Sequence, residues 1–366
     1  MTKIELKSIN KSFLGKKALE DISFTVESGD FVSILGPATA GKSTLLRIIA
    51  GTLKPEKGKV YFDDKDVTDY PAQKRNVGVI FQTFALYPNM SVYGNIASPL
   101  RAKGLPGSEV DKRVKEISSI LRIEDLMEKS PYELSGGQAQ RVATARALVK
   151  DAAAYLLDEP LTNIDYKLRE SMKIELKRIL EIKKSTIIYA TPSPEETSVL
   201  TNRMIFLHGG KVVQTGPVKE CFDAPANVTA GLHYSSPPMN IMDARVVRKD
   251  GKSALNIEGR LELDTTHLDF LLEEDEYKVG IYPYSLFLSP ERKGMLSIPM
   301  KMELQELAGS EMTVRLRWNE TSLTMYVPYE RFLEEKVTVF LDPSDFYIFS
   351  KKTEGLVTRY RPGRKG

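Results

Sequence analysis

The sequence of 366 residues contains one cysteine, Cys221, and three histidines. A single cysteine excludes a disulfide framework within the chain and a cysteine-based zinc site, and it fits a reducing compartment. The histidines, His208, His233 and His267, lie far apart in the sequence, and none pairs with another at metal-ligand spacing. Partners and cofactors therefore have to be inferred from other residue types.

Long hydrophobic runs and a strong charge of one sign are also missing. The first residues, MTKIELKSINKSF, carry charges throughout, unlike a signal peptide, and no apolar run approaches the roughly 20 residues that span a bilayer. The 52 Lys and Arg residues against 49 Asp and Glu residues give a net charge of +3, which is too small to indicate a nucleic-acid or lipid-binding protein. We expect a chain that is soluble, or peripheral to a membrane through other subunits.

The N-terminal half alternates two kinds of apolar pattern. Strand-like runs such as DFVSILG precede helix-like runs such as STLLRIIAG, which predicts an α/β layer fold. The middle portion is predicted to be helical over residues 108–129. The apolar face of this predicted helix consists of Val110, Val114, Ile117, Ile120 and Leu121.

After residues 235–238, which are SSPP, the pattern changes to a period of two. Runs such as MTVRLRW and KVTVFL alternate apolar and polar residues between short turns, which predicts a small all-β barrel or sandwich. We therefore expect domains at 1–235 and 236–366. The second domain has 19 Lys and Arg residues and 21 Asp and Glu residues, and this balance argues against a barrel that binds nucleic acid.

The segment ILGPATAGKST matches the phosphate-binding loop pattern of Gly36, four residues, and then Gly41, Lys42 and Ser43. It follows a predicted strand and begins a predicted helix. Backbone N–H groups of such a loop wrap a phosphate, the lysine reaches the terminal phosphates, and the serine binds magnesium. The candidate nucleotide-binding residues of this P-loop are Gly36, Pro37, Ala38, Thr39, Ala40, Gly41, Lys42, Ser43 and Thr44.

Two further segments suit the same chemistry. AAAYLLDEP, at 152–160, is an apolar strand that ends in Asp158, placed to hold magnesium through water, and Glu159, placed to polarise an attacking water. LSGGQAQRVATARAL, at 134–148, begins an Ala-rich helix with paired glycines, which form a second anion cradle. One chain thus carries two phosphate-binding helix ends.

Taken in order, these motifs resemble those of the ATP-binding-cassette (ABC) ATPases. The resemblance runs through Phe13, the P-loop, Gln82 in VIFQTFALYP, the signature LSGGQ, the DEP segment and Asp165 in LTNID. It covers about residues 1–235, and the order of the motifs is highly specific.

Within that family the sequence resembles the ATPase subunits of bacterial carbohydrate importers, which energise the uptake of maltose, glycerol phosphate and similar solutes. KRNVGVIFQTFALYPNMSVYGNI and LDEPLTNIDYKLRE carry this likeness, and VGIYPYSLFLSPE resembles the regulatory barrel of those subunits. The resemblance implies a P-loop ABC ATPase domain, with a RecA-like core and a helical subdomain at about 87–150, followed by a small all-β OB-like domain. It implies membrane permease subunits, a second ABC ATPase subunit and, indirectly, an extracytoplasmic solute-binding protein as partners, without nucleic acid, at the cytoplasmic face of the inner membrane.

The resemblance also assigns residues to a shared ATP and Mg²⁺ site. Two cassettes would face head to tail, so that each ATP lies between the P-loop of one chain and the LSGGQ segment of its partner. Phe13 would stack on adenine, Gln82 would sense magnesium and link the nucleotide to the membrane subunits, and Asp165 would lie at the dimer seam. The implied catalytic residues are Glu159, Gln82 and Lys42; the implied magnesium ligands are Ser43, Gln82 and Asp158; the residues implied to contact the partner's ATP are Ser135, Gly136, Gly137 and Gln138.

Two positions depart from the family pattern. Thr39 stands where most relatives have glycine, and its side chain restricts the backbone, so we expect a perturbed loop that still binds phosphate. Pro192, in YATPSPEE, stands where relatives have the histidine that contacts the γ-phosphate, and proline has no donor. We expect that the site on this chain's own P-loop binds ATP but hydrolyses it slowly. We also expect the chain to pair with a different ATPase subunit.

Other functions stay open at this point. The solute does not touch an ATPase subunit of this kind, so an importer of polyamine, iron or another anion fits the same residues. A soluble ABC ATPase of nucleic-acid repair or ribosome work is a second alternative, although only about fifty residues separate Gln82 from Leu134, which leaves no room for a long coiled-coil insertion. A regulatory ATP sensor without useful turnover is a third, which Pro192 favours.

Overall fold

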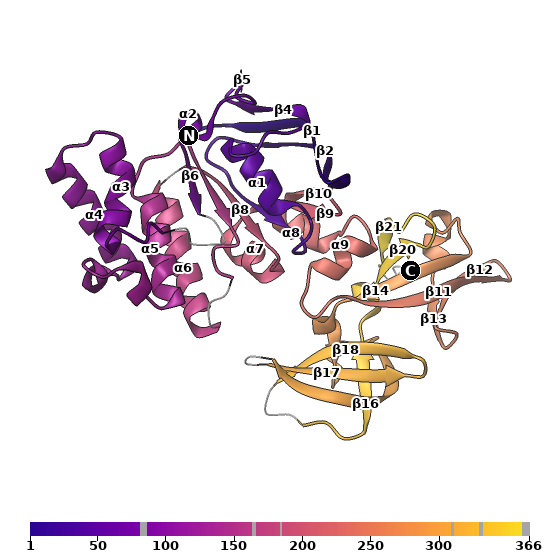
Figure 1. Cartoon of the computed structure of the whole chain (residues 1–366). Helices are drawn as coiled ribbons and strands as arrows, with labels where there is room; N and C mark the ends of the chain where they lie inside the picture. Colours follow the sequence, from indigo (N-terminus) through magenta and orange to yellow (C-terminus); the bar gives the residue numbers. More distant parts are fainter. Residues whose placement is uncertain (81–85, 163–165, 184, 309–310, 329–331, 361–366) are drawn as a thin grey trace. The chain divides into compact units, whose positions relative to one another are not determined.

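The computed structural model describes residues 1–80, 86–162, 166–183, 185–308, 311–328 and 332–360. The chain divides into two compact units, Met1–Lys219 and Glu220–Gly366, and each is described by itself (Figure 1). This division groups residues 220–235, which the sequence assigned to the first domain, with the second unit. Backbone bonds explain the grouping, because Val228 N donates to Glu354 O and Leu356 N donates to Ala226 O.

A six-stranded sheet in the order β10-β9-β3-β8-β7-β6 forms the centre of the first unit. All its neighbouring pairs are parallel except β9 and β10, which form a hairpin through Gly209 and Gly210. The inner strands β7 and β8 are buried along their whole length because both faces are covered. The strands are β3 (Phe31–Leu35), β6 (Val77–Ile80), β7 (Ala154–Asp158), β8 (Thr186–Thr191), β9 (Arg203–His208) and β10 (Lys211–Pro217).

A four-stranded antiparallel sheet, in the order β2-β1-β4-β5, lies on the other side of helix α1 (Lys42–Ala50) (Figure 1). Side chains of both sheets and of α1 share one hydrophobic core. Arg75 supports the C-terminal end of α1, since its buried guanidinium donates to the carbonyls of Ile48 and Ile49. The strands are β1 (Ile4–Phe13), β2 (Lys16–Val26), β4 (Lys57–Phe62) and β5 (Lys65–Asp66).

The helices after β6 form a second core of the first unit, which also includes Tyr155 and Leu157 of β7. Helix α4 buries the predicted apolar face except for Ile120, which is 42 % exposed, and it ends at Leu121 because Arg122 has a φ of 53°. The prediction of a helix running to residue 129 is therefore wrong. The helices after β6 are α3 (Val92–Ala102), α4 (Gly107–Leu121), α5 (Gly136–Leu148), α6 (Tyr166–Lys183) and α7 (Pro194–Leu200), with 3₁₀ turns η1 (Glu124–Leu126) and η2 (Pro131–Glu133). The short helix α2 (Ala72–Arg75) precedes β6.

The second unit consists of two antiparallel sheets around one core, in the orders β13-β12-β11-β14-β20-β21 and β15-β19-β16-β17-β18. Alternate residues point inward along strands such as β18, which confirms the predicted all-β, OB-like barrel. The strands are β11 (Asn240–Lys249), β12 (Lys252–Ile257), β13 (Leu261–Asp264), β14 (Glu276–Ile281), β15 (Leu286–Phe287), β16 (Leu296–Ala308), β17 (Glu311–Trp318), β18 (Thr321–Pro328), β19 (Lys336–Leu341), β20 (Tyr347–Ser350) and β21 (Leu356–Arg359).

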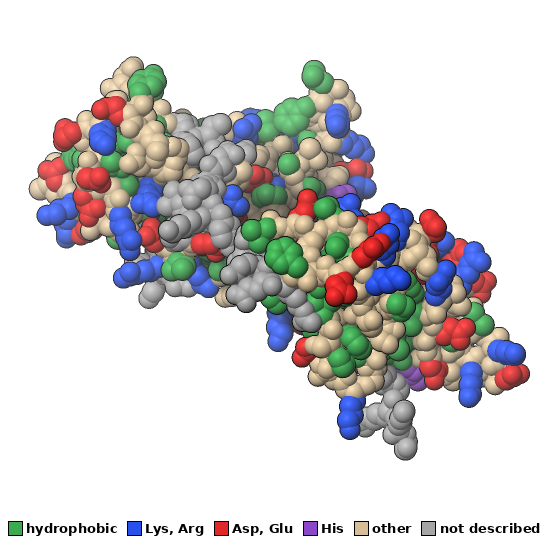
Figure 2. Space-filling model, turned by 90° about the horizontal axis from the view of Figure 1, so that it is seen from below, with side chains coloured by type: hydrophobic (Ala, Val, Ile, Leu, Met, Phe, Trp, Pro, Cys, Tyr) green, Lys and Arg blue, Asp and Glu red, His purple; other side chains and the backbone are tan. Residues whose placement is uncertain are grey.

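Short helices complete the chain. They are α8 (Val218–Asp223), which crosses the division between the units, α9 (Val228–His233), η3 (Thr266–Leu271), η4 (Pro283–Ser285) and η5 (Pro343–Asp345). Of the helices in the described ranges, none is long and apolar enough to cross a membrane. Basic and acidic side chains are interspersed on the face shown in Figure 2, in keeping with the small net charge of the sequence.

Candidate active site

The loop between β3 and α1 leaves no room for side chains at two of its glycines. A Cβ on Gly36 would lie 2.2 Å from the carbonyl oxygen of Leu207, and a Cβ on Gly41 would lie 2.7 Å from the carbonyl oxygen of Ala18. Gly41 also has a φ of 102°, a conformation that favours glycine, and it caps α1. The two glycines let the backbone turn closely enough to present its N–H groups at the helix N-terminus.

The other residues of the loop have ordinary backbone conformations. Ala40 is buried beneath the loop, whereas Ala38 and Thr39 are exposed. Within residues 36–44 only Gly41 has a positive φ, so Thr39 requires no strained conformation. The perturbation expected from its larger side chain is not seen in the backbone of this loop.

Lys42 is the most buried cation of the site, with 1 % of its surface exposed. Its Nζ donates to the carbonyls of Gly36 at 2.7 Å and Pro37 at 2.9 Å, and it forms an ion pair with Glu159 Oε1 at 3.1 Å. The lysine thus contacts its own loop and pairs with the carboxylate that the sequence predicts to be catalytic.

Ser43 and Asp158 meet at the start of α1 and the end of β7. Ser43 Oγ donates to Asp158 Oδ1 at 2.9 Å, and Asp158 is 3 % exposed. Burial raises the pKa of the Asp158 carboxyl; the Ser43 hydrogen bond opposes that rise, and the neighbouring Glu159 carboxylate adds to it. Bringing a cation to these oxygens would offset the cost of ionising Asp158.

Glu159 is held in an unusual backbone conformation directly after β7. Its φ is 48°, which is uncommon for a residue with a side chain. Its N–H donates to the carbonyl of Ala190 at 3.0 Å, and Thr162 Oγ1 donates to its second carboxylate oxygen at 3.3 Å. The backbone and Thr162 together direct the carboxylate toward Lys42 and the P-loop.

The end of β8 connects the two neighbouring strands of the site. The carbonyl of Thr191 accepts from Gly36 N at 3.2 Å, as the carbonyl of Ala190 accepts from Glu159 N. Each donor is the first residue after a parallel strand, one on either side of β8. In open α/β sheets, ligands bind beyond this edge.

Sequence reasoning missed the group that supports the end of β8. The buried carboxylate of Glu196 accepts hydrogen bonds from Tyr189 Oη at 2.8 Å and Thr191 Oγ1 at 2.6 Å. Burial raises the pKa of the Tyr189 phenol, and the Glu196 carboxylate raises it further, so the phenol stays a donor. The sequence signal that could have indicated this role is an acidic residue early in the helix after the strand, Glu196 in the segment SPEE.

Pro192 lies between residues that this network and the cap of α7 hold. Ser193 Oγ accepts from Glu196 N at 3.1 Å, and Ser193 N donates to Thr191 Oγ1 at 3.1 Å. Pro192 itself is exposed. The backbone on both sides of the position is therefore ordered by local hydrogen bonds, while position 192 offers no hydrogen-bond donor.

The signature segment forms the N-terminal end of α5. Ser135 caps the helix, because Gln138 N donates to its Oγ at 3.3 Å and Ser135 N donates to Gln138 Oε1 at 3.0 Å. Ser135 and Gly136 are exposed, and a Cβ on Gly136 would meet nothing within 4 Å. Between the described residues of this segment and the P-loop no hydrogen bond or ion pair is formed, and the exposed side of the helix end lies at Ser135 and Gly136.

Phe13, at the end of β1, does not contact the residues of this network. It is 47 % exposed, and Lys11 Nζ lies over its ring, 5.5 Å from the centroid. Gln82 and Asp165 lie outside the described residues.

ATP and Mg²⁺ fit the residues that the structure brings together. The loop packs so closely at Gly36 and Gly41 that it can turn with its N–H groups at the start of α1, and the buried ammonium group of Lys42 lies beside it. The described chain has no group of three or more His, Cys, Asp or Glu that would hold a metal by itself. Magnesium is commonly bound by one or two carboxylates together with substrate phosphates, which matches Ser43 and Asp158. When bound there, it neutralises phosphate charge.

We predict that Gly36→Ala weakens nucleotide binding by about 10- to 100-fold, because overpacking costs about 1–3 kcal/mol and the added methyl would collide with the Leu207 carbonyl. Titration with a fluorescent ATP analogue measures the effect. Gly107→Ala, at the start of α4, whose methyl meets open space, is the matched control and should bind the analogue as the wild type does. Equal losses in the two variants would contradict this description of the loop.

We also predict that Asp158→Asn leaves the nucleotide-free chain as stable as the wild type, or more stable, near neutral pH. A raised pKa means that the folded state binds the proton more tightly, so the stability contributed by the protonated carboxyl is lost as the pH rises through its folded pKa. Thermal unfolding in a chelator, compared at neutral and acidic pH, tests the prediction. The stability advantage of Asp158→Asn over the wild type should shrink as the pH falls. The variant should also lose the Mg²⁺-dependent stabilisation by ATP. A variant that is less stable than the wild type at neutral pH would refute it.

Comparisons with known proteins agree with this geometry. A family model described as ABC transporter matches residues 19–162. The sequence is 34 % identical over 331 residues to the sn-glycerol-3-phosphate import ATP-binding protein UgpC of Escherichia coli, covering 90 % of this chain and 92 % of the relative. It is 36 % identical over 369 residues to the trehalose/maltose import ATP-binding protein MalK of Thermococcus litoralis, covering 96 % and 99 %.

Solved structures share the fold of the first unit. The dimeric, post-hydrolysis structure of the ATP-binding cassette MJ0796 with ADP and Pi matches with a TM-score of 0.55 and 32 % identity, over 59 % of this chain and 98 % of that one. CbiO1 of Clostridium perfringens matches with a TM-score of 0.55 and 30 % identity, over 60 % and 90 %. The predicted P-loop ABC ATPase fold is therefore confirmed. The chain belongs to the ABC transporter family, as an ATPase that uses ATP with Mg²⁺.

Proposed function

We propose that this chain is the ATP-hydrolysing subunit of an importer for a carbohydrate or polyol, of the sugar, glycerol or glycerol-phosphate class. The observation that carries the proposal is similarity over both units, since the match to UgpC spans 90 % of the chain and the match to MalK spans 96 %. Those relatives are import ATP-binding proteins for sn-glycerol 3-phosphate and for trehalose and maltose. The β-unit, which an isolated cassette lacks, is included in the likeness.

The site residues take the following roles in this proposal. Lys42 leaves Glu159 to bind the terminal phosphates, and Glu159 is then free to polarise the attacking water. Ser43 and Asp158, with Gln82, would hold Mg²⁺, and Phe13 would stack on adenine. Asp165 would lie at the seam between two cassettes. The remaining nucleotide-binding residues are those of the P-loop, 36–44.

The exposed signature segment supports a second ATPase subunit as a partner. Ser135, Gly136, Gly137 and Gln138 would bind the γ-phosphate side of the ATP on the facing chain, because their helix end is capped and is exposed at Ser135 and Gly136. Membrane permease subunits would carry the solute and hold the pair at the cytoplasmic face of the inner membrane. An extracytoplasmic solute-binding protein would act through those permeases.

Pro192 supports an unlike pair. Losing one preorganised contact to developing charge typically costs about 3–4 kcal/mol, or roughly a hundred- to a thousandfold in rate. Lys42, Glu159 and Asp158 remain in place, so this chain's own site would bind ATP and turn it over slowly. Its intact signature segment would complete a faster site on the partner.

Co-purification tests the transport function. The full chain, tagged and expressed at its natural level, should be recovered from detergent-solubilised membranes together with permease subunits and a second ABC ATPase. ATP hydrolysis by that complex in vesicles should rise when the binding protein and a sugar or polyol are supplied. Recovery with ribosomes or DNA, without permeases, would contradict the proposal.

The unlike pair has a separate test. We predict that Pro192→His raises the ATP turnover of the purified chain by about tenfold or more, since it restores a donor between two ordered residues. Ser135→Arg, mixed with the partner ATPase, should reduce turnover at the partner's site more than at this chain's own site. A wild-type chain that already matches Pro192→His would contradict the slow site. Unchanged turnover of the mixed pair with Ser135→Arg would contradict the shared site.

A further inference from the structure

Four basic side chains line one cavity of the second unit. The cavity has a volume of about 550 Å³ and is lined by residues of β16, β17 and β19 and by the turn between β12 and β13. This volume lies in the range of small-ligand sites. No acidic residue lines the cavity. The basic residues are Arg260, Lys301, Arg317 and Lys336.

The strand register aligns three of these cations in a row. Lys301 of β16 lies directly opposite Arg317 of β17 on one side and Lys336 of β19 on the other. Residues directly opposite each other share a face of the sheet, and like charges at such positions destabilise the pair. A row of three cations is thus a cost to the sheet that needs compensation.

The protein compensates only part of this charge. Glu335 forms an ion pair with Lys301 at 2.9 Å, and Glu303 forms one with Arg317. The field of Glu335 also reaches Lys336. Within the described chain, however, no carboxylate lies at ion-pair distance from Lys336 or Arg260. Four cations are matched by two carboxylates, and the excess positive charge borders the cavity.

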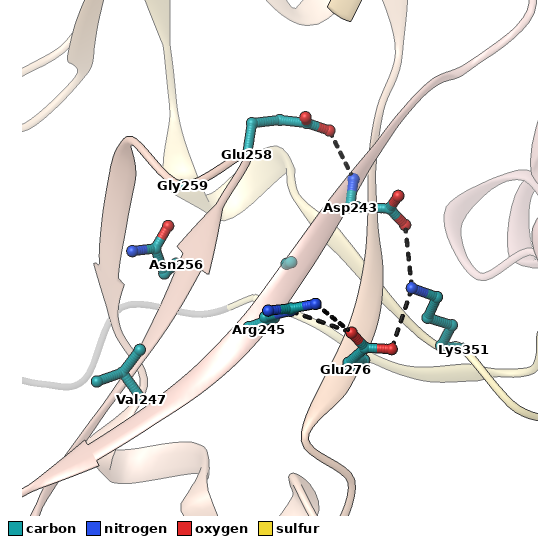
Figure 3. A pocket seen from close by; sticks show the side chains of 9 residues that line it. Asp243, Arg245, Val247, Asn256, Glu258, Gly259, Glu276 and Lys351 are labelled. Carbon is teal, nitrogen blue, oxygen red and sulfur yellow. Dashed lines mark hydrogen bonds and ion pairs between the residues drawn. The ribbon is translucent and has the colours of Figure 1, made fainter.

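A neighbouring pocket on the other sheet shows what full compensation looks like (Figure 3). There Arg245 pairs with Glu276 at 3.0 Å, and Lys351 lies 3.1 Å from Glu276 and 4.0 Å from Asp243. Its two basic side chains are directed at acidic ones, and three carboxylates, Asp243, Glu258 and Glu276, line the pocket. Every cation of this pocket is thus matched, whereas those of the cavity beside Lys301 are not.

The rest of the cavity lining is partly apolar and includes the polar residues Asn319 and Thr338. Pro299 supplies exposed aliphatic surface on the face of the sheet that carries Lys301. Met300 and Trp318, at 4 % and 6 % exposure, line the cavity with little exposed surface. An inorganic ion would use the cations alone. A ligand that combines an anionic group with a short carbon skeleton would use both parts of the lining.

We propose that this cavity binds a small organic phosphate, with the phosphate among Lys336, Arg260 and Lys301 and the carbon skeleton against Pro299, which lies on the same face of the sheet as Lys301 and Lys336. Lysine and arginine are the usual partners of phosphate, through charge-assisted hydrogen bonds. Bound phosphate would supply the negative charge that the cross-strand row lacks. The lining of this cavity shares no residue with the ATP site.

Trp318 makes the test direct, because it is the single tryptophan of the chain and it lines this cavity. The full-length protein is titrated with glycerol 3-phosphate while indole fluorescence is recorded, and calorimetry of the same titration detects binding if the indole is silent. We expect saturable binding of glycerol 3-phosphate, weaker binding of inorganic phosphate and no binding of glycerol. The double variant Lys336→Gln with Arg260→Gln should bind at least tenfold more weakly, since each lost charge-assisted contact costs about tenfold.

Lys351→Gln, in the pocket where Lys351 pairs with Glu276, is the matched control and should bind glycerol 3-phosphate as the wild type does. Vesicles of phosphatidylglycerol and of phosphatidylcholine separate a free phosphate from a lipid headgroup. A response only to phosphatidylglycerol vesicles would overturn the proposal in favour of a membrane contact. The absence of saturable binding, an equal affinity for inorganic phosphate, or an unchanged affinity of the double variant would each refute it as well.

Discussion

The site depends on two backbone hydrogen bonds at the end of β8. The carbonyls of Ala190 and Thr191 hold Glu159 and Gly36, the first residues after the two strands that flank β8. A parallel sheet brings the ends of separate chain segments to one edge, and these two bonds fix the phosphate-binding loop and the catalytic carboxylate relative to each other. The Glu196 carboxylate stabilises the end of β8 by accepting hydrogen bonds from the hydroxyls of Tyr189 and Thr191.

The buried charges at this edge are paired with one another. Lys42 neutralises Glu159, and Asp158, whose pKa is raised by burial, shares a hydrogen bond with Ser43. A buried ion pair contributes little net stability, because desolvation offsets its attraction, and its partners are therefore available for exchange. Phosphate and magnesium supply the opposite charges for Lys42 and Asp158, so binding of substrate releases Glu159 for chemistry.

Much of this site was predictable, because the P-loop and the Asp-Glu pair are local sequence patterns with a fixed structural context. The roles of Glu196 and the cross-strand row at Lys301 were not, since both depend on which residues a tertiary fold brings together. The apolar period predicted α4 but not its end, which the left-handed conformation of Arg122 sets. Thr39 looked like a strained substitution by analogy, but the loop needs a positive φ only at Gly41.

The most direct test of this account is the affinity of Glu159→Gln for a non-hydrolysable ATP analogue, measured with Mg²⁺ by calorimetry on the purified chain. The account predicts tighter binding than in the wild type, because the amide no longer holds the Lys42 ammonium or repels the terminal phosphate. Each 1.4 kcal/mol by which the Lys42–Glu159 interaction opposes nucleotide binding corresponds to about tenfold in affinity. An affinity equal to or weaker than that of the wild type would contradict the claim that the Lys42–Glu159 ion pair must open for the nucleotide to bind.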